Sequence, residues 1–190
     1  MFKRILVAVD RSPASSAGLH SAVALAADQR AALIALHVID DGSLPINFEG
    51  ALYPPSYVDA YFEAMAAIGR KILDRTLKLA RASHVRIDCV LVRSQGNTVA
   101  EAIVEQSRKL KADIIVLGTH GRRGLKRVLM GSDAEQVVRE AGVPVLLVRG
   151  EGQARKRTRP APAKARAPAK ARRSLSVDAD QRARRGRGVQ

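Results

Sequence analysis

Short runs of Val, Ile and Leu alternate along residues 1–150 with stretches whose apolar positions recur every three or four residues. The runs are apolar without strict alternation, which is typical of strands that are covered on both faces of a sheet. They predict five strands, at Ile5–Val9, Leu33–Ile39, Val85–Val92, Asp113–Leu117 and Val143–Val148. The helical spacing between them predicts four helices, over Ala14–Asp28, Tyr57–Arg81, Val99–Leu110 and Ser132–Glu140.

Two of these helices begin with the spacing of a capping box. In this motif a Ser or Thr at the N-cap and a Glu three residues later satisfy amide groups that the helix leaves free. Thr98 with Glu101 predicts the start of the third helix, and Ser132 with Glu135 predicts the start of the fourth.

Strict alternation of strands and helices predicts an α/β fold, because right-handed crossovers place the helices on both faces of a parallel sheet. We expect a doubly wound five-stranded parallel sheet, flavodoxin-like, with strand order 3-2-1-4-5. Ligands of such sheets bind beyond the carboxyl ends of the strands, where the chain reverses direction across the sheet. The strands at this reversal end at Asp10 and Gly118. The long connection Asp41–Ser56 leaves the same edge and suits a lid or a partner surface as well as plain slack.

Positive charge is concentrated at the carboxyl end of the chain. The last forty residues hold 13 Lys and Arg and 3 Asp and Glu, and residues 1–150 hold the other 20 and 15, which gives net charges of +10 and +5. Residues 151–190 lack aromatic side chains and repeat Ala-Pro-Ala-Lys-Ala-Arg, so we predict a disordered basic tail after a domain of residues 1–150. Such a tail suits nonspecific contact with nucleic acid, with a solvated extension as the alternative.

The single cysteine and the apolar run at the amino terminus indicate the cellular compartment in which we expect the protein. Cys89 is the single cysteine and cannot form an internal disulfide, which favours a reducing environment. It lies in an apolar run, so we expect a buried strand residue and not a reactive thiol. The apolar run before Asp10 is too short for an export signal, and no run approaches the roughly twenty residues of a membrane helix. We expect a cytoplasmic protein without membrane contact.

The segment Gly118–Ser132 carries the candidate chemistry. Its glycines allow a close approach of the backbone to a ligand. The amide groups at Gly131 and Ser132 would open the last helix, whose positive dipole end suits a phosphate. The Ser132 hydroxyl can bind a phosphate oxygen as well as cap the helix. A Walker loop, Gly-x4-Gly-Lys-Ser/Thr, is absent, which excludes a P-loop NTPase.

These residues also resemble the universal stress protein family. Gly118-x2-Gly121-x9-Gly131-Ser132 has the spacing of the ATP-binding members of that family. The opening Ile5-Leu6-Val7-Ala8-Val9-Asp10-x-Ser12 is similar to the first strand of the family. Three more segments are similar to its second, fourth and fifth strands, namely Leu36–Ile39, Ala112–Gly118 and Val143–Val148.

The resemblance implies ATP as the ligand, with Mg²⁺ as a candidate companion, and gives roles to matched positions. Asp10 would meet the ribose or a metal near the phosphates, although a role as cap of the following helix explains it equally well. The backbone of Val38 would pair with adenine, and Leu117 would add apolar contact. The other positions of the implied site are Ser12, Gly118, His120, Gly121, Arg122, Gly131, Ser132 and Asp133.

We expect a specific role for several of these positions. Gly118 and Gly121 would line the path of the ribose and phosphates, which Gly131 and Ser132 would hold. Asp133 suits the helix dipole but would repel phosphate unless it holds Mg²⁺. His120 has no nucleophile and orienting acid assigned around it, so we expect a positioning or structural role. Arg122 and the neighbouring cations would attract a polyphosphate over a distance.

Three classes of function follow. The first is an ATP-binding stress-response protein in which the nucleotide sets conformation or partner choice, with slow hydrolysis at most, because no base or positioned water is visible. The second is an interaction protein that keeps the fold without the nucleotide. The third is an enzyme of the wider adenine-nucleotide α-hydrolase-like group, which is disfavoured because the Ser-Gly-Gly-x-Asp-Ser loop is absent after the first strand. The resemblance also implies a homodimer through Val143–Val148.

Overall fold

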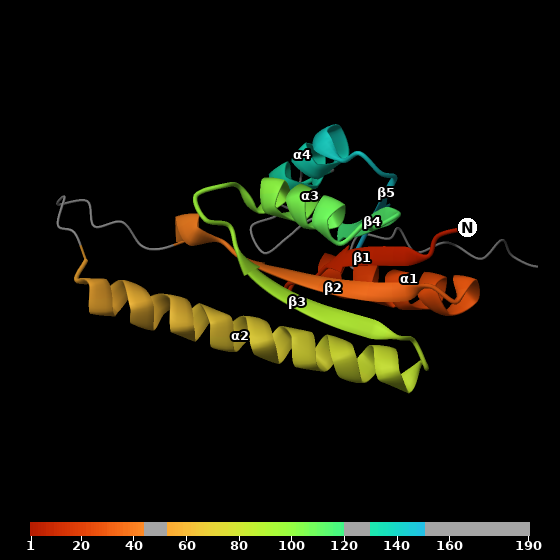
Figure 1. Ribbon diagram of the computed structural model, residues 1–190, viewed down its shortest axis with the longest axis horizontal. Helices are drawn as coiled ribbons and strands as arrows, with labels where there is room; N and C mark the ends of the chain where they lie inside the picture. The colour runs from red at the N-terminus through yellow and green to blue at the C-terminus, as the bar shows by residue number, and fades with distance from the viewer. Residues whose placement is uncertain (44–52, 120–129, 151–190) are drawn as a thin grey trace, which may run out of the picture. The chain divides into compact units, whose positions relative to one another are not determined.

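The computed structural model describes residues 1–43, 53–119 and 130–150 (Figure 1). The predicted alternation of strands and helices is confirmed, and the ends of the elements differ from the prediction by at most two residues. In chain order the elements are β1 (Arg4–Ala8), α1 (Pro13–Gln29), β2 (Ala32–Ile39), the 3-10 turn η1 (Asp41–Ser43), α2 (Pro55–Ala82), β3 (Ile87–Arg93), α3 (Val99–Lys109), β4 (Ile114–Gly118), α4 (Ser132–Glu140) and β5 (Val145–Val148).

The five strands form one parallel sheet in the order β3-β2-β1-β4-β5, which confirms the predicted topology. β1 lies at the centre, where Ile5 is opposite Leu33 of β2 and Ile114 of β4. These three side chains are at least 95% buried, as the apolar runs require of strands covered on both faces. The reversal of chain direction therefore lies between β1 and β4.

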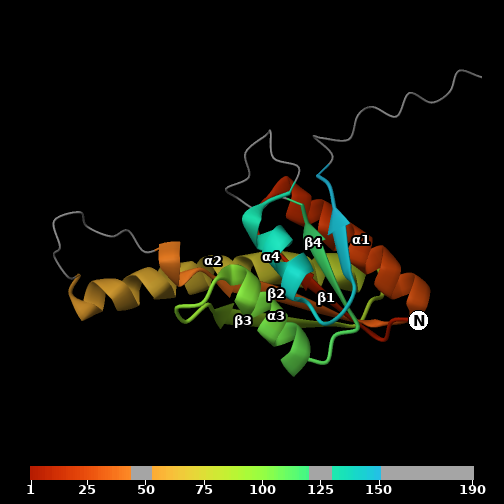
Figure 2. The ribbon, with the colours of Figure 1, turned by 90° about the horizontal axis from the view of Figure 1, so that it is seen from above.

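Helices cover both faces of the sheet and bury two separate cores (Figure 2). Successive side chains of β1 point to opposite faces. Ile5 and Val7 enter the core under α1 and α2, while Leu6 enters the core under α3 and α4. α2 packs along β2 and β3, and α1 packs along β1, β4 and β5. The arrangement has three layers, helix, sheet and helix, with the carboxyl ends of all strands at one edge.

The first turns of α1 approach the end of β4 very closely. A Cβ atom added at Gly118 would lie 2.5 Å from the carbonyl carbon of Ala14 and 2.6 Å from the amide nitrogen of Ser15. One added at Gly18 would lie 3.3 Å from the Gly118 nitrogen. Glycine at these positions lets helix and strand backbones touch, which fixes the start of α1 over the carboxyl edge of the sheet.

The two edge strands are less buried than the centre. β3 has no fully buried residue, and Asp88, Cys89 and Arg93 are exposed. The expectation of a buried Cys89 is therefore wrong, because β3 is an edge strand and is not covered on both faces. Partial burial of the thiol raises the pKa of Cys89, and the carboxylates of Asp74 and Asp88 raise it further. A reactive thiolate is disfavoured there.

β5 forms the other edge of the sheet. It is four residues long, and its apolar side chains are half-buried except Leu146, which is exposed. The predicted strand began at Val143, but the ladder begins two residues later, because Pro144 contributes only its carbonyl to the amide of Ile115. Among the described residues, no helix is both long enough and apolar enough to cross a membrane.

Candidate functional site

At the carboxyl edge of the sheet, β2 extends beyond the end of β1, which leaves a step between the two strands. Ala8, the last residue of β1, is opposite Leu36, and β2 continues for three more residues to Ile39. The Val9 amide donates to Leu36 O (2.8 Å), and Nδ1 of the buried His37 lies 2.6 Å from Val9 O. Because a carbonyl oxygen only accepts, Nδ1 carries the proton. The backbone of Val38 thus lies beyond the end of β1.

Asp10 and Ser12 form the turn from β1 into α1. Oδ1 of Asp10 accepts the amide proton of Ser12 (2.7 Å), and the Asp10 amide donates to Ser15 Oγ (2.8 Å). Ser12 is the N-cap, and its side chain accepts from the amide of Ser15 at 3.0 Å. The structure therefore assigns the cap to Ser12, and the alternative reading of Asp10 as the cap is wrong. Asp10 is half-buried at this edge.

The start of α4 is attached to the end of β4. The Thr119 amide donates to Val148 O and the Gly131 amide donates to Thr119 O, both at 2.8 Å. Gly131 is the N-cap of α4, without a side-chain capping bond, and Ser132 is the first helical residue. The predicted capping box of Ser132 and Glu135 is wrong, because the helix begins one residue earlier and the Glu135 amide bonds to Gly131 O. The capping box of Thr98 and Glu101 is confirmed, with bonds of 2.7 and 3.1 Å.

The structure brings part of the predicted site together. Val7 is opposite Val116, so Asp10 and Gly118 emerge side by side where β1 and β4 end, and the bond to Thr119 holds Gly131 there. Ser132 and Asp133 are exposed in the first turn of α4.

Two predicted apolar contacts are tied to the core, and three predicted residues cannot be placed. Leu117 is buried in the core under α3 and α4, against which the half-buried Val38 also packs. His120, Gly121 and Arg122 lie outside the described residues, as do the basic tail and most of the connection after β2. In the described ranges, no three His, Cys, Asp or Glu residues lie together as metal ligands would.

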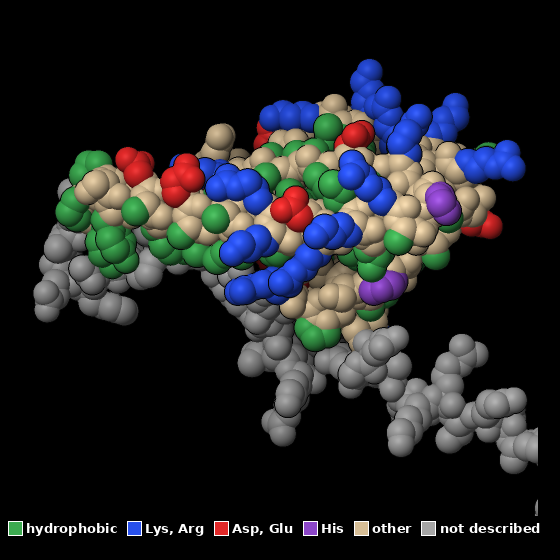
Figure 3. All heavy atoms as spheres, turned by 90° about the horizontal axis from the view of Figure 1, so that it is seen from below, with side chains coloured by type: hydrophobic (Ala, Val, Ile, Leu, Met, Phe, Trp, Pro, Cys, Tyr) green, Lys and Arg blue, Asp and Glu red, His purple; other side chains and the backbone are tan. Residues whose placement is uncertain are grey.

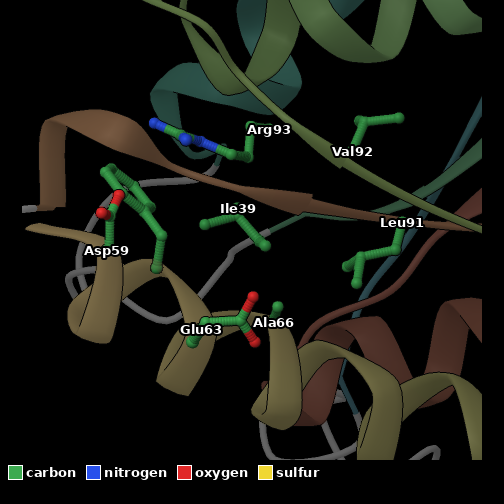
Figure 4. A pocket seen from close by; sticks show the side chains of 8 residues that line it. Ile39, Asp59, Glu63, Ala66, Leu91, Val92 and Arg93 are labelled. Carbon is green, nitrogen blue, oxygen red and sulfur yellow. The ribbon is translucent and has the colours of Figure 1, made fainter.

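A separate hollow of about 380 Å³ lies where the first half of α2 passes the ends of β2 and β3 (Figure 4). The guanidinium of Arg93 stacks 3.5 Å above the ring of Phe62 and forms two bonds of 3.1 and 3.2 Å with the Asp41 carboxylate. Arg93 therefore ties η1 and α2 to β3. The hollow contains none of the predicted site residues. It is lined by Ile39, Asp59, Phe62, Glu63, Ala66, Leu91, Val92 and Arg93.

Comparison with known proteins decides the family. The model of the universal stress protein family matches residues 1–149. The chain belongs to this family. It is 32% identical over 149 residues to the universal stress protein MJ0531 of Methanocaldococcus jannaschii, which covers 78% of this chain and 83% of that protein.

Solved structures of universal stress proteins have the same fold. UspA from Lactobacillus plantarum superimposes with a TM-score of 0.66 at 26% identity, over 77% of this chain and 97% of that one. A universal stress protein in complex with cAMP superimposes with a TM-score of 0.57 at 25% identity, over 78% and 98%. The family model ends at residue 149, which leaves residues 150–190 of this universal stress protein unmatched by it.

Sequence reasoning did not single out three residues that shape the site. Ser15 holds the Asp10 amide, His37 holds the Val9 carbonyl, and the Thr119 backbone connects α4 to β5. The spacing Ser12-x-x-Ser15, which places a second hydroxyl one turn after an N-cap, could have identified the first. The bonds of the other two join residues distant in the sequence, and no local pattern signals them.

Proposed function

We propose that this universal stress protein binds an adenine nucleotide, ATP in the first place, at the carboxyl edge of β2, β1 and β4. The observation that carries the proposal is the attachment of the α4 start to Thr119, at the reversal of the sheet. The first amide groups of α4 have no partners within the helix, and the helix dipole adds positive potential there. A phosphate group suits this position. The solved relative in complex with cAMP supports an adenine nucleotide as ligand class.

The adenine would lie against the step between β1 and β2. Because β2 runs past the end of β1, the Val38 backbone can offer an amide and a carbonyl to the base edge. Main-chain recognition of this kind selects adenine by its donor and acceptor pattern and not by charge. Asp10, half-buried in the turn from β1 into α1, would accept from the ribose hydroxyls.

Two carboxylates at the same edge are candidate ligands for Mg²⁺. Oδ1 of Asp10 already accepts the Ser12 amide, so a metal would bind its other oxygen. Asp133, exposed in the first turn of α4, is the second candidate. When bound, the ion neutralises phosphate charge, which would offset the repulsion from Asp133. With no general base among these residues, we propose slow hydrolysis at most, and a nucleotide that acts as a ligand for conformation or partner choice.

Calorimetric titration with ATP, with and without MgCl₂, tests the proposal. Gly131 has φ −77° and ψ 156°, which any residue adopts, so Gly131→Ala adds a methyl group to the phosphate seat without backbone strain. We expect a weaker affinity by about tenfold, or roughly 1.4 kcal/mol. Gly142→Ala is the matched control, since a Cβ atom there meets nothing within 4 Å. Absence of heat with the wild-type protein, or equal affinities for both variants, would contradict the proposal.

We also propose a cytoplasmic homodimer that pairs through the segment Val143–Val148. Its support is the free edge of β5, whose backbone groups can pair with a second strand, beside the exposed Leu146. Leu146→Lys should convert the dimer to a monomer in light scattering. A dimer that survives this change would have another interface.

For residues 151–190, outside the domain that the family model matches, we propose nonspecific contact with nucleic acid. Thirteen cations without aromatic side chains support electrostatic binding without base stacking. DNA retention by the full chain and by a chain that ends at Gly150, measured over a salt series, tests this. Equal retention by both would contradict it.

A further inference from the structure

A strongly basic surface lies at the amino edge of the sheet, opposite the candidate nucleotide site. Six exposed cations gather where three strands begin and α2 ends, and we call them the basic end. They are Lys3, Arg4, Lys78, Arg81, Arg86 and Lys111. Figure 3 shows Lys and Arg side chains along the face that carries α2 and toward the end of the molecule where α2 terminates.

Backbone hydrogen bonds place the starts of β3, β2, β1 and β4 beside one another. The cations at these strand starts therefore belong to one surface. The Leu33 amide bonds to Arg86 O and the Ala32 amide bonds to Lys3 O, both at 2.9 Å. The Asp113 amide bonds to Arg4 O at 2.8 Å, which places Lys111 beside β1. Neighbouring strands lie about 4.8 Å apart, so the three steps from β3 to β4 extend the surface over roughly 14 Å.

The carboxyl end of α2 continues this surface. Lys78 and Arg81 are three residues apart and therefore lie on neighbouring parts of one helix face. The Val85 amide bonds to Ala80 O, which holds the end of α2 close to the start of β3 and to Arg86.

Within the part of the chain that the structure describes, no salt bridge involves a residue of the basic end. The salt bridges there use Arg70, Arg93 and Lys109. Oδ2 of Asp113 accepts the amides of Lys3 and Arg4 (2.6 and 2.8 Å), and this carboxylate also interacts with the positive charges of both side chains, so it offsets part of the charge of the basic end. Asp74 and Asp88, on α2 and β3, reduce the local charge without reversing its sign.

Helix dipoles account for only part of this pattern. A cation in the last turn of a helix stabilises it, which explains Arg81 in α2 and, just past the end of α3, Lys111. It does not explain Lys3, Arg4 or Arg86, which lie at strand starts. A surface that gathers cations from several elements is the electrostatic footprint of polyanion binding.

We propose that the basic end binds the phosphodiester backbone of double-stranded nucleic acid without reading its sequence. A duplex carries one charge per roughly 1.7 Å of its axis, counting both strands, so a roughly 14 Å length of duplex carries about eight phosphate charges, of which part face the basic end. The stacked pair Tyr53–Tyr57 and the edge-to-face pair Tyr61–Phe62 lie just before and in the first turns of α2, far along the helix from Arg81. Base stacking is therefore no part of this contact.

Nucleic acid suits the basic end better than a lipid surface. Binding to a membrane surface needs apolar side chains that enter the lipid beside the cations. Of the exposed large apolar side chains in the described residues, only Met1 lies near the basic end. The proposal does not rest on nucleotide binding, since the two surfaces lie at opposite edges of the sheet, and ATP should not compete with the duplex.

Fluorescence anisotropy with the full chain and a labelled mixed-sequence duplex, over a series of NaCl concentrations, tests the proposal. The test variant is Lys78→Gln/Arg81→Gln/Arg86→Gln. The control variant is Arg11→Gln/Arg139→Gln/Arg149→Gln, which removes the same charge from exposed positions elsewhere. Each lost phosphate contact lowers the slope of log K against log salt by about 0.9. We expect a loss of about 2.7 in the test variant and little change in the control.

Several outcomes would overturn the proposal. An equal loss of slope in both triple variants would show a dependence on net charge alone, and no loss in the test variant would remove the basic end from the contact. A second variant, Lys3→Gln/Lys111→Gln, touches only exposed side chains and should lower the slope by about 1.8. If the test variant instead loses binding to vesicles of phosphatidylglycerol and phosphatidylcholine while duplex binding is unchanged, the surface belongs to a membrane contact.

Discussion

Replacement of Gly118 by Ala perturbs the point where α1 and β4 touch. The new Cβ atom would lie 2.5 and 2.8 Å from the carbonyl carbon and oxygen of Ala14 and 2.6 Å from the Ser15 nitrogen, where ordinary contact begins at 3.4 Å. All three neighbours are backbone atoms and cannot rotate away, so α1 must move back from the sheet.

A shift of α1 would disturb a second close contact as well. The start of α1 also lies against Gly150, just after β5, where an added Cβ atom would lie 3.0 Å from the Ala14 nitrogen. Added atoms in a packed interior cost about 1–3 kcal/mol, and we expect the upper half of this range because backbone must shift. For a chain of this size that lowers the melting temperature by about 4–12 °C, at roughly 2–4 °C per kcal/mol.

Thermal and urea unfolding of Gly118→Ala measure this effect, with Gly142→Ala as the control that should stay within about 0.5 kcal/mol of the wild type. Because α1 carries Ser12 and Ser15, which hold Asp10, the affinity for ATP should also fall. Unfolding of Gly118→Ala at the wild-type temperature would refute the reasoning, since it would mean that α1 can move away from β4 at no cost.

Two further predictions concern single polar side chains. Thr98→Ala should cost about 1 kcal/mol in urea unfolding, because it removes a capping bond, whereas Ser132→Ala should leave stability unchanged and weaken only ATP binding; equal costs would restore a capping role to Ser132. The amides of Lys3 and Arg4 lower the pKa of Asp113, so its carboxylate stabilises the fold above its ordinary pKa of about 3.9 and that stability is lost as the pH falls. The stability difference between wild type and Asp113→Asn should therefore shrink in acid, and a difference independent of pH would contradict this account.

The sequence predicted the topology well because each strand is a local apolar run and each crossover has one favoured hand. Its errors lie where tertiary position overrides a local pattern. Cys89 lies in an apolar run like the central strands, yet strand order places it at an edge. Ser132 has the spacing of a cap, yet the bond from Gly131 to Thr119 starts the helix one residue earlier.

The sequence predicted the position of the candidate site better than it predicted the contacts within the site. The reversal of the sheet located Asp10 and Gly118 at one edge, because carboxyl ends of parallel strands meet there. The contacts that fix those residues, such as the bond between His37 and Val9, join segments far apart in the sequence. Only the folded chain reveals them.

The two edge strands of the sheet, β3 and β5, differ in polarity. This difference limits how many copies of this chain can join strand to strand. A parallel sheet with two apolar edges could add strands at both sides and grow without end. Here only the β5 edge is apolar, while β3 exposes Asp88 and Arg93 along the other side. Two copies that pair through β5 about a two-fold axis, as proposed above, would use the only apolar sheet edge among the described residues. Such an assembly would end at two, with charged margins on both outer sides.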